Sequence, residues 1–199
     1  MTWDVLNIIG TIAFAISGAI VAMEEDYDIL GLYFLGFTTA FGGGTIRNLL
    51  IGLPIDMIWQ QEMLFIICFV GITILLILPK VWIYYWNKWG VFFDAIGLAA
   101  FAMQGALFAV QANASLSAVL VAATLTGAGG GVLRDLLAGR KPMIFQLEIY
   151  ALWATLAGLI IGLDLIQGPI STAILFIAIV TLRMCSVYFK WTLPRFRIT

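Results

Sequence analysis

Seven apolar runs follow one another along the chain, separated by short polar stretches. A helix needs about 20 mostly apolar residues to cross the hydrocarbon core of a bilayer. Polar stretches such as Glu24–Asp28 and Gly139–Pro142 end the runs, because charged groups are costly in lipid. The pattern predicts seven transmembrane helices, at about Asp4–Met23, Ile29–Leu50, Glu62–Leu78, Gly90–Val110, Ser115–Leu137, Glu148–Leu163 and Pro169–Phe189.

The pattern also repeats itself. The glycine triad Gly42–Gly44 returns 87 positions later as Gly129–Gly131, and at the same offset the first and fourth predicted helices share the pattern I-G-x-x-A-F-A-x-x-G-A. Each copy holds three predicted helices, an odd number, so the second copy enters the membrane from the opposite face. The expected fold is therefore all-α, with an inverted repeat of three plus three helices and one C-terminal helix. The predicted units are residues 1–85, residues 86–166, and a seventh helix with a basic tail over residues 167–199.

Composition supports an integral membrane protein. Hydrophobic residues make up 63% of the chain and charged residues 11%, whereas a soluble domain carries about a quarter charged. The net charge of -1 gives no reason to expect a nucleic-acid partner. The chain has no histidine, and Cys68 and Cys185 lie in apolar runs. We therefore expect no metal site, no cofactor and no enzymatic activity.

Lysine and arginine predict the orientation, because loops rich in them stay in the cytoplasm. The connections on one side of the predicted bundle contain neither residue. The other side carries all the basic residues outside the helices, namely Lys80, Lys88, Arg140, Lys141, Lys190, Arg195 and Arg197. We expect a multi-pass protein of the cell's plasma (inner) membrane, with its N-terminus outside and its C-terminus in the cytoplasm.

The two triads are the strongest candidates for a functional site. Three adjacent glycines each weaken a helix by about 1 kcal/mol relative to alanine, and an arginine in hydrocarbon costs at least a few kcal/mol. Arg47 and Arg134 each follow a triad by one helical turn. We interpret the triads as helix breaks whose free carbonyls line a cavity; close helix packing is the alternative. The site is expected between the Gly42–Arg47 and Gly129–Arg134 segments, with Arg134→Ala altering transport more than folding.

Other polar residues inside the predicted helices extend this site. Asp135 directly follows Arg134 and is expected to be a poor partner for it, because adjacent side chains diverge on a helix. Asp94 is either a helix cap or a charge that faces the site. Arg183, near the end of the last helix, is expected to reach the interface. The candidate pathway residues are Ser17, Gly42, Gly43, Gly44, Arg47, Asn48, Asp94, Gln104, Gly129, Gly130, Gly131, Arg134 and Asp135. For Gly10, Gly18, Gly97 and Gly105, close packing is the preferred interpretation.

The segments Gly127–Gly131 and Gly139–Pro142, together with Gly42–Gly44, resemble the trimeric intracellular cation channels, and more narrowly their bacterial relatives built from two domains labelled glycine transporter. The resemblance implies a homotrimer in the lipid bilayer. It also implies a pathway for potassium or sodium within each subunit, lined by the second and fifth helices, which bend at the triads. Bound lipid is compatible with it, although the basic residue that animal members carry in the fourth helix has no clear match.

Two further functions remain open at this stage. A secondary transporter would hold the carboxylate of a small amino acid such as glycine against Arg47 or Arg134 and the N-terminal ends of half-helices. A membrane scaffold without transport requires both triads to serve packing alone.

Overall fold

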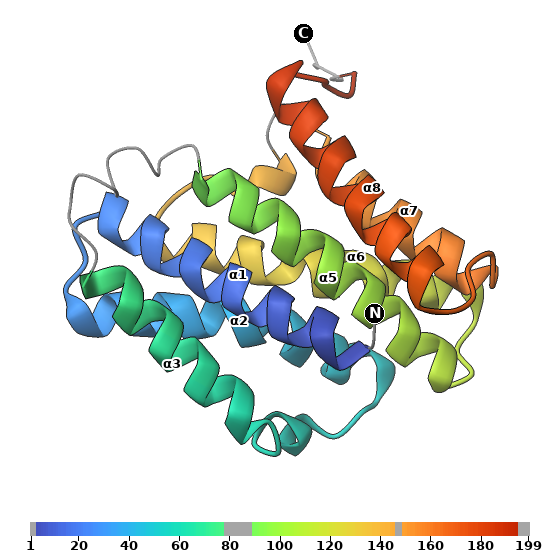
Figure 1. Cartoon of the computed structure of the whole chain (residues 1–199), viewed down its shortest axis with the longest axis horizontal. Coiled ribbons are helices and arrows are strands. Elements are labelled where there is room, and N and C mark those ends of the chain that lie inside the picture. The colour runs from blue at the N-terminus through green and yellow to red at the C-terminus, as the bar shows by residue number, and fades with distance from the viewer. Residues whose placement is uncertain (1–2, 78–88, 146–148, 195–199) are drawn as a thin grey trace, which may run out of the picture.

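The computed structural model describes residues 3–77, 89–145 and 149–194. Within these ranges the chain is helical, as expected, and Figure 1 shows the arrangement. The helices are α1 (Trp3–Glu24), α2 (Ile29–Ile51), α3 (Glu62–Ile77), α5 (Trp89–Gln111), α6 (Leu116–Leu137), α7 (Ala151–Gly162) and α8 (Pro169–Tyr188), with short 3₁₀ turns η1 (Ile55–Ile58) and η2 (Met143–Phe145). Lys80, Lys88, Glu148, Arg195 and Arg197 lie outside the described residues.

Five of these helices, α1, α2, α5, α6 and α8, are long and apolar enough to cross a membrane. Helix α3 has 16 residues and α7 has 12, so at 1.5 Å per residue α7 covers about 18 Å. The expected start at Glu148 lies outside the described residues; α7 begins at Ala151, and just before it the Ile149 N–H donates to the carbonyl of Trp191 at 3.1 Å. Seven helices are present in the described residues, and five have spanning length.

Four helices form the centre of the molecule. Helices α1, α2, α5 and α6 pack on one another, and in Figure 1 α1 and α5 run side by side in opposite directions. Helix α3 packs on α1 and α2, and α7 packs in the same way on α5 and α6, while α8 contacts α5 and α7. The two groups of three helices therefore have matching neighbours and opposite directions, as an inverted repeat requires.

The repeat also extends to the helix ends. Asp28 and Ser115, 87 positions apart, cap α2 and α6 by accepting a hydrogen bond from the backbone N–H three residues later. Gly52 and Gly139 follow these helices with φ of 73° and 70°, a region that glycine enters without a steric penalty. The same local signals therefore start and stop both helices.

Two loops that lie far apart in the sequence are joined by charge. The Arg140 side chain lies 2.6 Å from a carboxylate oxygen of Glu24 and 2.5 Å from one of Glu25. Burial alone would lower the pKa of Arg140, but its hydrogen bonds to these two carboxylates outweigh burial and raise it. Tyr27 adds a hydrogen bond to the carbonyl of Leu137 at 2.8 Å. The α1–α2 loop and the end of α6 thus lie on one side of the bundle.

The glycine triads are the place where α2 and α6 cross. Both helices continue without a break through their triads, so the expectation that the triads unwind is wrong. A Cβ on Gly43 would meet the backbone carbonyl of Thr126, and a Cβ on Gly130 would meet that of Thr39. The absence of these side chains lets the two backbones touch, and the packing gained at the crossing outweighs the weak helix propensity of glycine.

Glycines elsewhere in the centre have the packing role that the sequence indicated. A Cβ on Gly18 would stand 2.7 Å from the carbonyl oxygen of Leu35, and one on Gly105 would stand 2.5 Å from that of Ala122. Gly10 and Gly97 lie against the rings of Phe101 and Phe14, respectively. The packing prediction for these glycines is confirmed.

Gly43→Ala is expected to destabilise the fold, because the added methyl group meets a backbone carbonyl that cannot rotate away. Overpacking of this kind costs about 1–3 kcal/mol. Thermal unfolding of the purified protein in detergent should show a clear drop in the midpoint temperature.

Gly44→Ala is the matched control. A Cβ on Gly44 approaches only the Arg47 side chain, at 3.7 Å, so the gain in helix propensity of up to about 1 kcal/mol should leave stability unchanged or higher. Equal losses in both variants would show that the close crossing does not limit stability.

Candidate functional site

Arg47 and Arg134 lie on opposite flanks of the α2–α6 crossing. Both are buried, with 5% and 0% of their surface exposed. Arg134 contacts Ser17 in the second half of α1, whereas Arg47 shares a cavity with Asn7 near the start of that helix. The sequence placed one site between the two triads. The structure instead fills that space with the backbone contact and forms two separate sites.

Arg134 lies in a buried ion cluster. Its Nη1 donates to Asp94 Oδ1 and to Ser17 Oγ, both at 2.7 Å, and its Nε donates to Asp135 Oδ1 at 2.8 Å. Both carboxylates are almost completely inaccessible to solvent. One guanidinium is therefore held between two carboxylates and a hydroxyl group, away from water, where such bonds are strong.

Two sequence interpretations are corrected or decided here. Asp135 is a direct partner of Arg134, because the long arginine side chain folds back along its own helix and reaches its neighbour. Asp94 lies five residues inside α5, so it is not a helix cap and the interpretation as a charge facing the site is confirmed. Asp135 has a second role, since its Oδ2 accepts from the backbone N–H of Met143 at 2.9 Å and holds the η2 turn.

Arg47 has a different environment. Its Nε and Nη2 donate to the amide oxygen of Asn48 at 3.0 and 2.9 Å, and its guanidinium lies 4.1 Å from the centre of the Phe108 ring. Asn48 in turn donates to the carbonyl of Pro54 at 3.2 Å. Within the described residues, Nη1 of Arg47 has no hydrogen-bond partner and Arg47 forms no ion pair.

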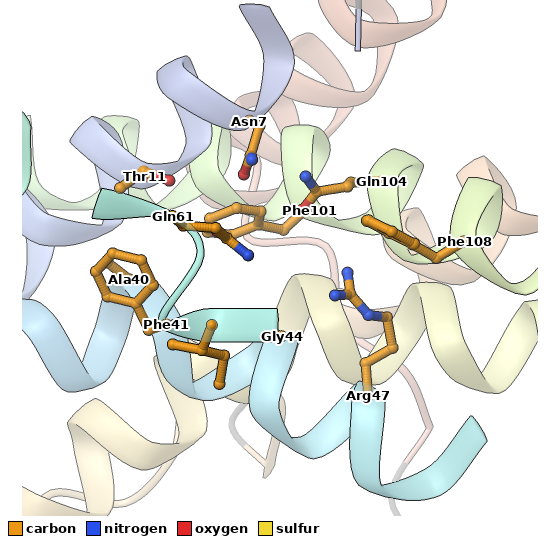
Figure 2. Close-up of a pocket in the computed structure, with 11 residues that line it drawn as sticks. Asn7, Thr11, Ala40, Phe41, Gly44, Arg47, Gln61, Phe101, Gln104 and Phe108 are labelled. Atoms are coloured by element: carbon orange, nitrogen blue, oxygen red, sulfur yellow. The ribbon is translucent and has the colours of Figure 1, made fainter. Parts of the chain in front are cut away.

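The cavity beside Arg47 lies among α1, α2, α5 and the segment that joins η1 to α3. The volume open to the centre of a water molecule is about 40 Å³. Figure 2 shows the guanidinium of Arg47 and the amide of Gln104 pointing into this space. The lining residues are Asn7, Thr11, Ala40, Phe41, Gly44, Arg47, Ile58, Gln61, Phe101, Gln104 and Phe108. Apart from Arg47, the polar side chains among them are amides and a hydroxyl group.

The predicted site residues thus fall into three groups. Gly44, Arg47, Asn48 and Gln104 lie at or beside the cavity, and Ser17, Asp94, Arg134 and Asp135 form the ion cluster. The remaining glycines pack: Gly42 against Leu133, Gly43, Gly129 and Gly130 at the crossing, and Gly131 toward Tyr150 and Asp94. Whether these residues line a pathway remains a prediction.

The sequence interpretation missed several cavity residues. Asn7 had a signal, because it matches Asp94 at the 87-residue offset. Phe108 had none, because its counterpart at this offset, Val21, is apolar; Gln61 falls opposite Glu148, but it was not singled out as a site residue. Among the described residues, no group of three or more histidine, cysteine or acidic side chains could hold a metal ion.

Arg183 does not reach the interface as expected. It is fully buried, its guanidinium lies 4.9 Å from the centre of the Tyr150 ring, and its Nη2 lies 3.7 Å from the sulfur of Met143. These contacts hold α8 against the segment that leads into α7, so Arg183 has a place in the packing of the second half.

Comparison with known proteins identifies relatives along the whole chain. The family model described as "Glycine transporter" matches twice, over residues 4–80 and 91–163. The UPF0126 membrane protein YvgT of Bacillus subtilis is 58% identical over 98% of this chain and 96% of its own length. The UPF0126 inner membrane protein YadS of Escherichia coli K12 is 32% identical over 97% of this chain and 95% of its own length. These relatives are named as membrane proteins, and the present chain is a multi-pass membrane protein by its helices.

Solved structures give the same result. One described as "Structural basis for conductance through TRIC cation channels" has a TM-score of 0.84 and 35% identity, and the match covers 100% of this chain and 99% of that one. The TRIC trimeric intracellular cation channel orthologue from Rhodobacter sphaeroides has a TM-score of 0.82 and 30% identity, with 94% and 98% covered. The resemblance inferred from the triads is confirmed. These proteins are ion channels, which agrees with the expectation that the chain is not an enzyme.

Asp94→Asn is expected to destabilise the protein strongly. It removes one partner of a buried ion pair, a change that costs about 3–5 kcal/mol. Arg134→Ala should be at least as harmful, because it leaves two carboxylates buried without a cation, whereas the sequence alone predicts a larger effect on transport than on folding. The yield of folded protein and its unfolding temperature measure both effects.

Glu24→Gln serves as the control for these variants. It removes one carboxylate from a pair whose side chains are 28% and 32% exposed, and such pairs contribute under about 1 kcal/mol. If Asp94→Asn and Glu24→Gln unfolded at the same temperature, the Arg134 cluster would not be a stabilising element.

Proposed function

Because the chain belongs to the family of trimeric intracellular cation channels, whose glycine-transporter model matches both of its halves, we propose that it is a cation channel with a pathway inside each subunit. One observation carries the proposal: charged and polar side chains are buried on both flanks of the α2–α6 crossing, inside helices of membrane-spanning length. Buried polar groups in such helices are costly and are typical of ion pathways.

The permeant ion is a monovalent cation, potassium first. The ion cluster offers two carboxylates against one guanidinium, so the Arg134 flank carries net negative charge, which favours a cation. A cation that crosses the Arg134 flank must separate Arg134 from Asp94 or pass beside their contact, so this cluster is the closed point of the pathway. A bend of α2 and α6 at the triads, which would widen the pathway, remains a prediction.

The assembly is a homotrimer; the Rhodobacter sphaeroides relative is named as a trimeric channel, which supports this. Lipid and neighbouring subunits would cover apolar side chains that α3 and α8 leave exposed, among them Ile66, Ile74, Ile170 and Ile174. The membrane is the plasma membrane.

The orientation follows from the basic residues. Arg140 lies beside the α1–α2 loop, and Trp191, next to Lys190, bonds to Ile149. Because it is rich in basic residues, we take this end of the bundle as the cytoplasmic side. The Arg134 cluster then lies in the cytoplasmic half of the membrane. The Arg47 cavity then lies toward the outside.

Two other functions lose their support. The transporter alternative needed half-helices that begin after Gly44 and Gly131, and both helices are continuous there. The scaffold alternative required the triads to pack, and they do. However, the solved relatives that share this fold are named as cation channels, and this favours conduction over a scaffold.

Recording of the purified protein in a planar bilayer tests the proposal. Ohmic unitary currents are expected, with a reversal potential in a KCl gradient close to that of potassium. Silence in the bilayer together with saturable glycine uptake into liposomes would contradict a channel.

A pair of glycine variants tests the pathway itself. Gly44 lines the cavity and has room for a side chain, so Gly44→Leu should fill the cavity and lower unitary conductance several-fold without unfolding the protein. Gly71→Leu is the control, since Gly71 on α3 also has open space and lies outside the cavity. Equal conductance in the two variants would exclude this cavity from the pathway.

A further inference from the structure

The two arginines are equivalent in the repeat, yet the groups around them differ in charge. Residues 87 positions apart occupy matching places, so Asn48 corresponds to Asp135 and Asn7 corresponds to Asp94. Asn48 contacts Arg47 in the way that Asp135 contacts Arg134, through a side-chain oxygen that accepts from Nε. At both positions the carboxylate of the second half is an amide in the first half. Arg134 therefore has two internal counter-charges, and Arg47 has the neutral form of each.

This difference leaves a buried positive charge without compensation. Arg47 is 95% buried, forms no ion pair in the described part of the chain, and its Nη1 has no hydrogen-bond partner there. Contact with the face of the Phe108 ring offsets only part of the cost of desolvation. A buried guanidinium requires an anion nearby or it destabilises the fold.

The cavity that Arg47 faces suits such an anion. The described residues that line it include no carboxylate. Thr11, Asn7, Gln61 and Gln104 supply hydroxyl and amide donors, and Figure 2 shows the Arg47 guanidinium directed into the same space. A volume of about 40 Å³ exceeds the ~10–15 Å³ that one water molecule needs, so one small ion with a water molecule fits and a large organic acid does not.

We propose that the cavity beside Arg47 is a binding site for a small monovalent anion, chloride or the carboxylate group of a one- or two-carbon acid. The bound anion supplies the charge that Asp94 and Asp135 supply to Arg134. Its ligands are Nη1 of Arg47 and the amide and hydroxyl donors of the cavity wall.

The site has a consequence for conduction, and this part rests on the proposed channel function. A cation that enters from the cavity side meets an uncompensated guanidinium, which repels it in a medium of low dielectric constant. An anion bound at Arg47 makes the site neutral and lowers that barrier. The cavity side of the channel is then opened by an anion from solution, whereas the other side depends on internal carboxylates.

Chloride binding to the purified full-length protein in detergent tests the site directly. The ³⁵Cl NMR line should broaden with wild-type protein and return to its free width in Arg47→Gln. Asn48→Asp places a carboxylate on Arg47 as in the second half, so it should also abolish broadening while the protein stays folded, which covers the case in which Arg47→Gln does not fold. Asn113→Asp, the same change at an exposed position, is the matched control and should keep wild-type broadening.

Competition separates the two sources of the anion. Formate that restores the free line width shows that the site accepts a small carboxylate, and broadening that survives formate assigns it to chloride. Gluconate, which is too large for the cavity, should have no effect. No specific broadening in the wild type, or equal broadening in the wild type, Arg47→Gln and Asn48→Asp, would overturn the proposal.

Bilayer recording tests the consequence separately. Replacement of chloride by gluconate on the cavity side should lower the potassium current of the wild type several-fold and leave that of Asn48→Asp independent of the anion. Chloride binding without any current would refute the channel and keep the anion site. Currents that ignore the anion in a protein that binds chloride would refute the coupling between them.

Discussion

The contact between the backbones of α2 and α6 at the two glycine triads determines where every other group of the centre lies. Gly43 and Gly130 face backbone carbonyls of the opposite helix, so the interhelical distance is set by main-chain atoms that cannot adjust their rotamers. The backbone carbonyls that these glycines face belong to Thr39 and Thr126. The hydroxyl groups of these two threonines donate to carbonyls of their own helices, both at 2.6 Å. Both threonine hydroxyl groups are therefore satisfied within their own helices, and both arginines one turn later are held on the flanks of the crossing.

Once the arginines are fixed in the interior, electrostatics decides what surrounds them. A guanidinium cannot lose its proton under ordinary conditions, so its burial must be matched by hydrogen bonds and counter-charge. Asp94 and Asp135 do this for Arg134 at distances of 2.7 Å. Asn48 and the Phe108 ring compensate the charge of Arg47 only in part. The two halves therefore have equivalent backbones, but the residues around their arginines differ in charge.

The helices could be predicted because their signals are local. Apolar runs, the caps Asp28 and Ser115, and the terminal glycine Gly52 set boundaries that the structure reproduces to within one or two residues. The contact that joins the start of α7 to the segment after α8, between Ile149 and Trp191, could not be predicted, since these residues lie far apart in the sequence. The triads were misread for the same kind of reason: their poor helix propensity is local, and the crossing that compensates for it is a tertiary contact.

The candidate site followed from the repeat more than from the residues taken one by one. Alignment at the 87-residue offset found both arginines and paired Asn7 with Asp94, but the rule that adjacent helical side chains diverge concealed the bond between Arg134 and Asp135. That rule describes Cβ directions, and an arginine has enough rotatable bonds to escape it. In an inverted repeat, equivalent positions lie toward opposite faces of the membrane, so an exchange of aspartate for asparagine gives the two faces different chemistry without altering the backbone. One flank then carries its counter-charge within the chain, and the other must take it from the solution it faces.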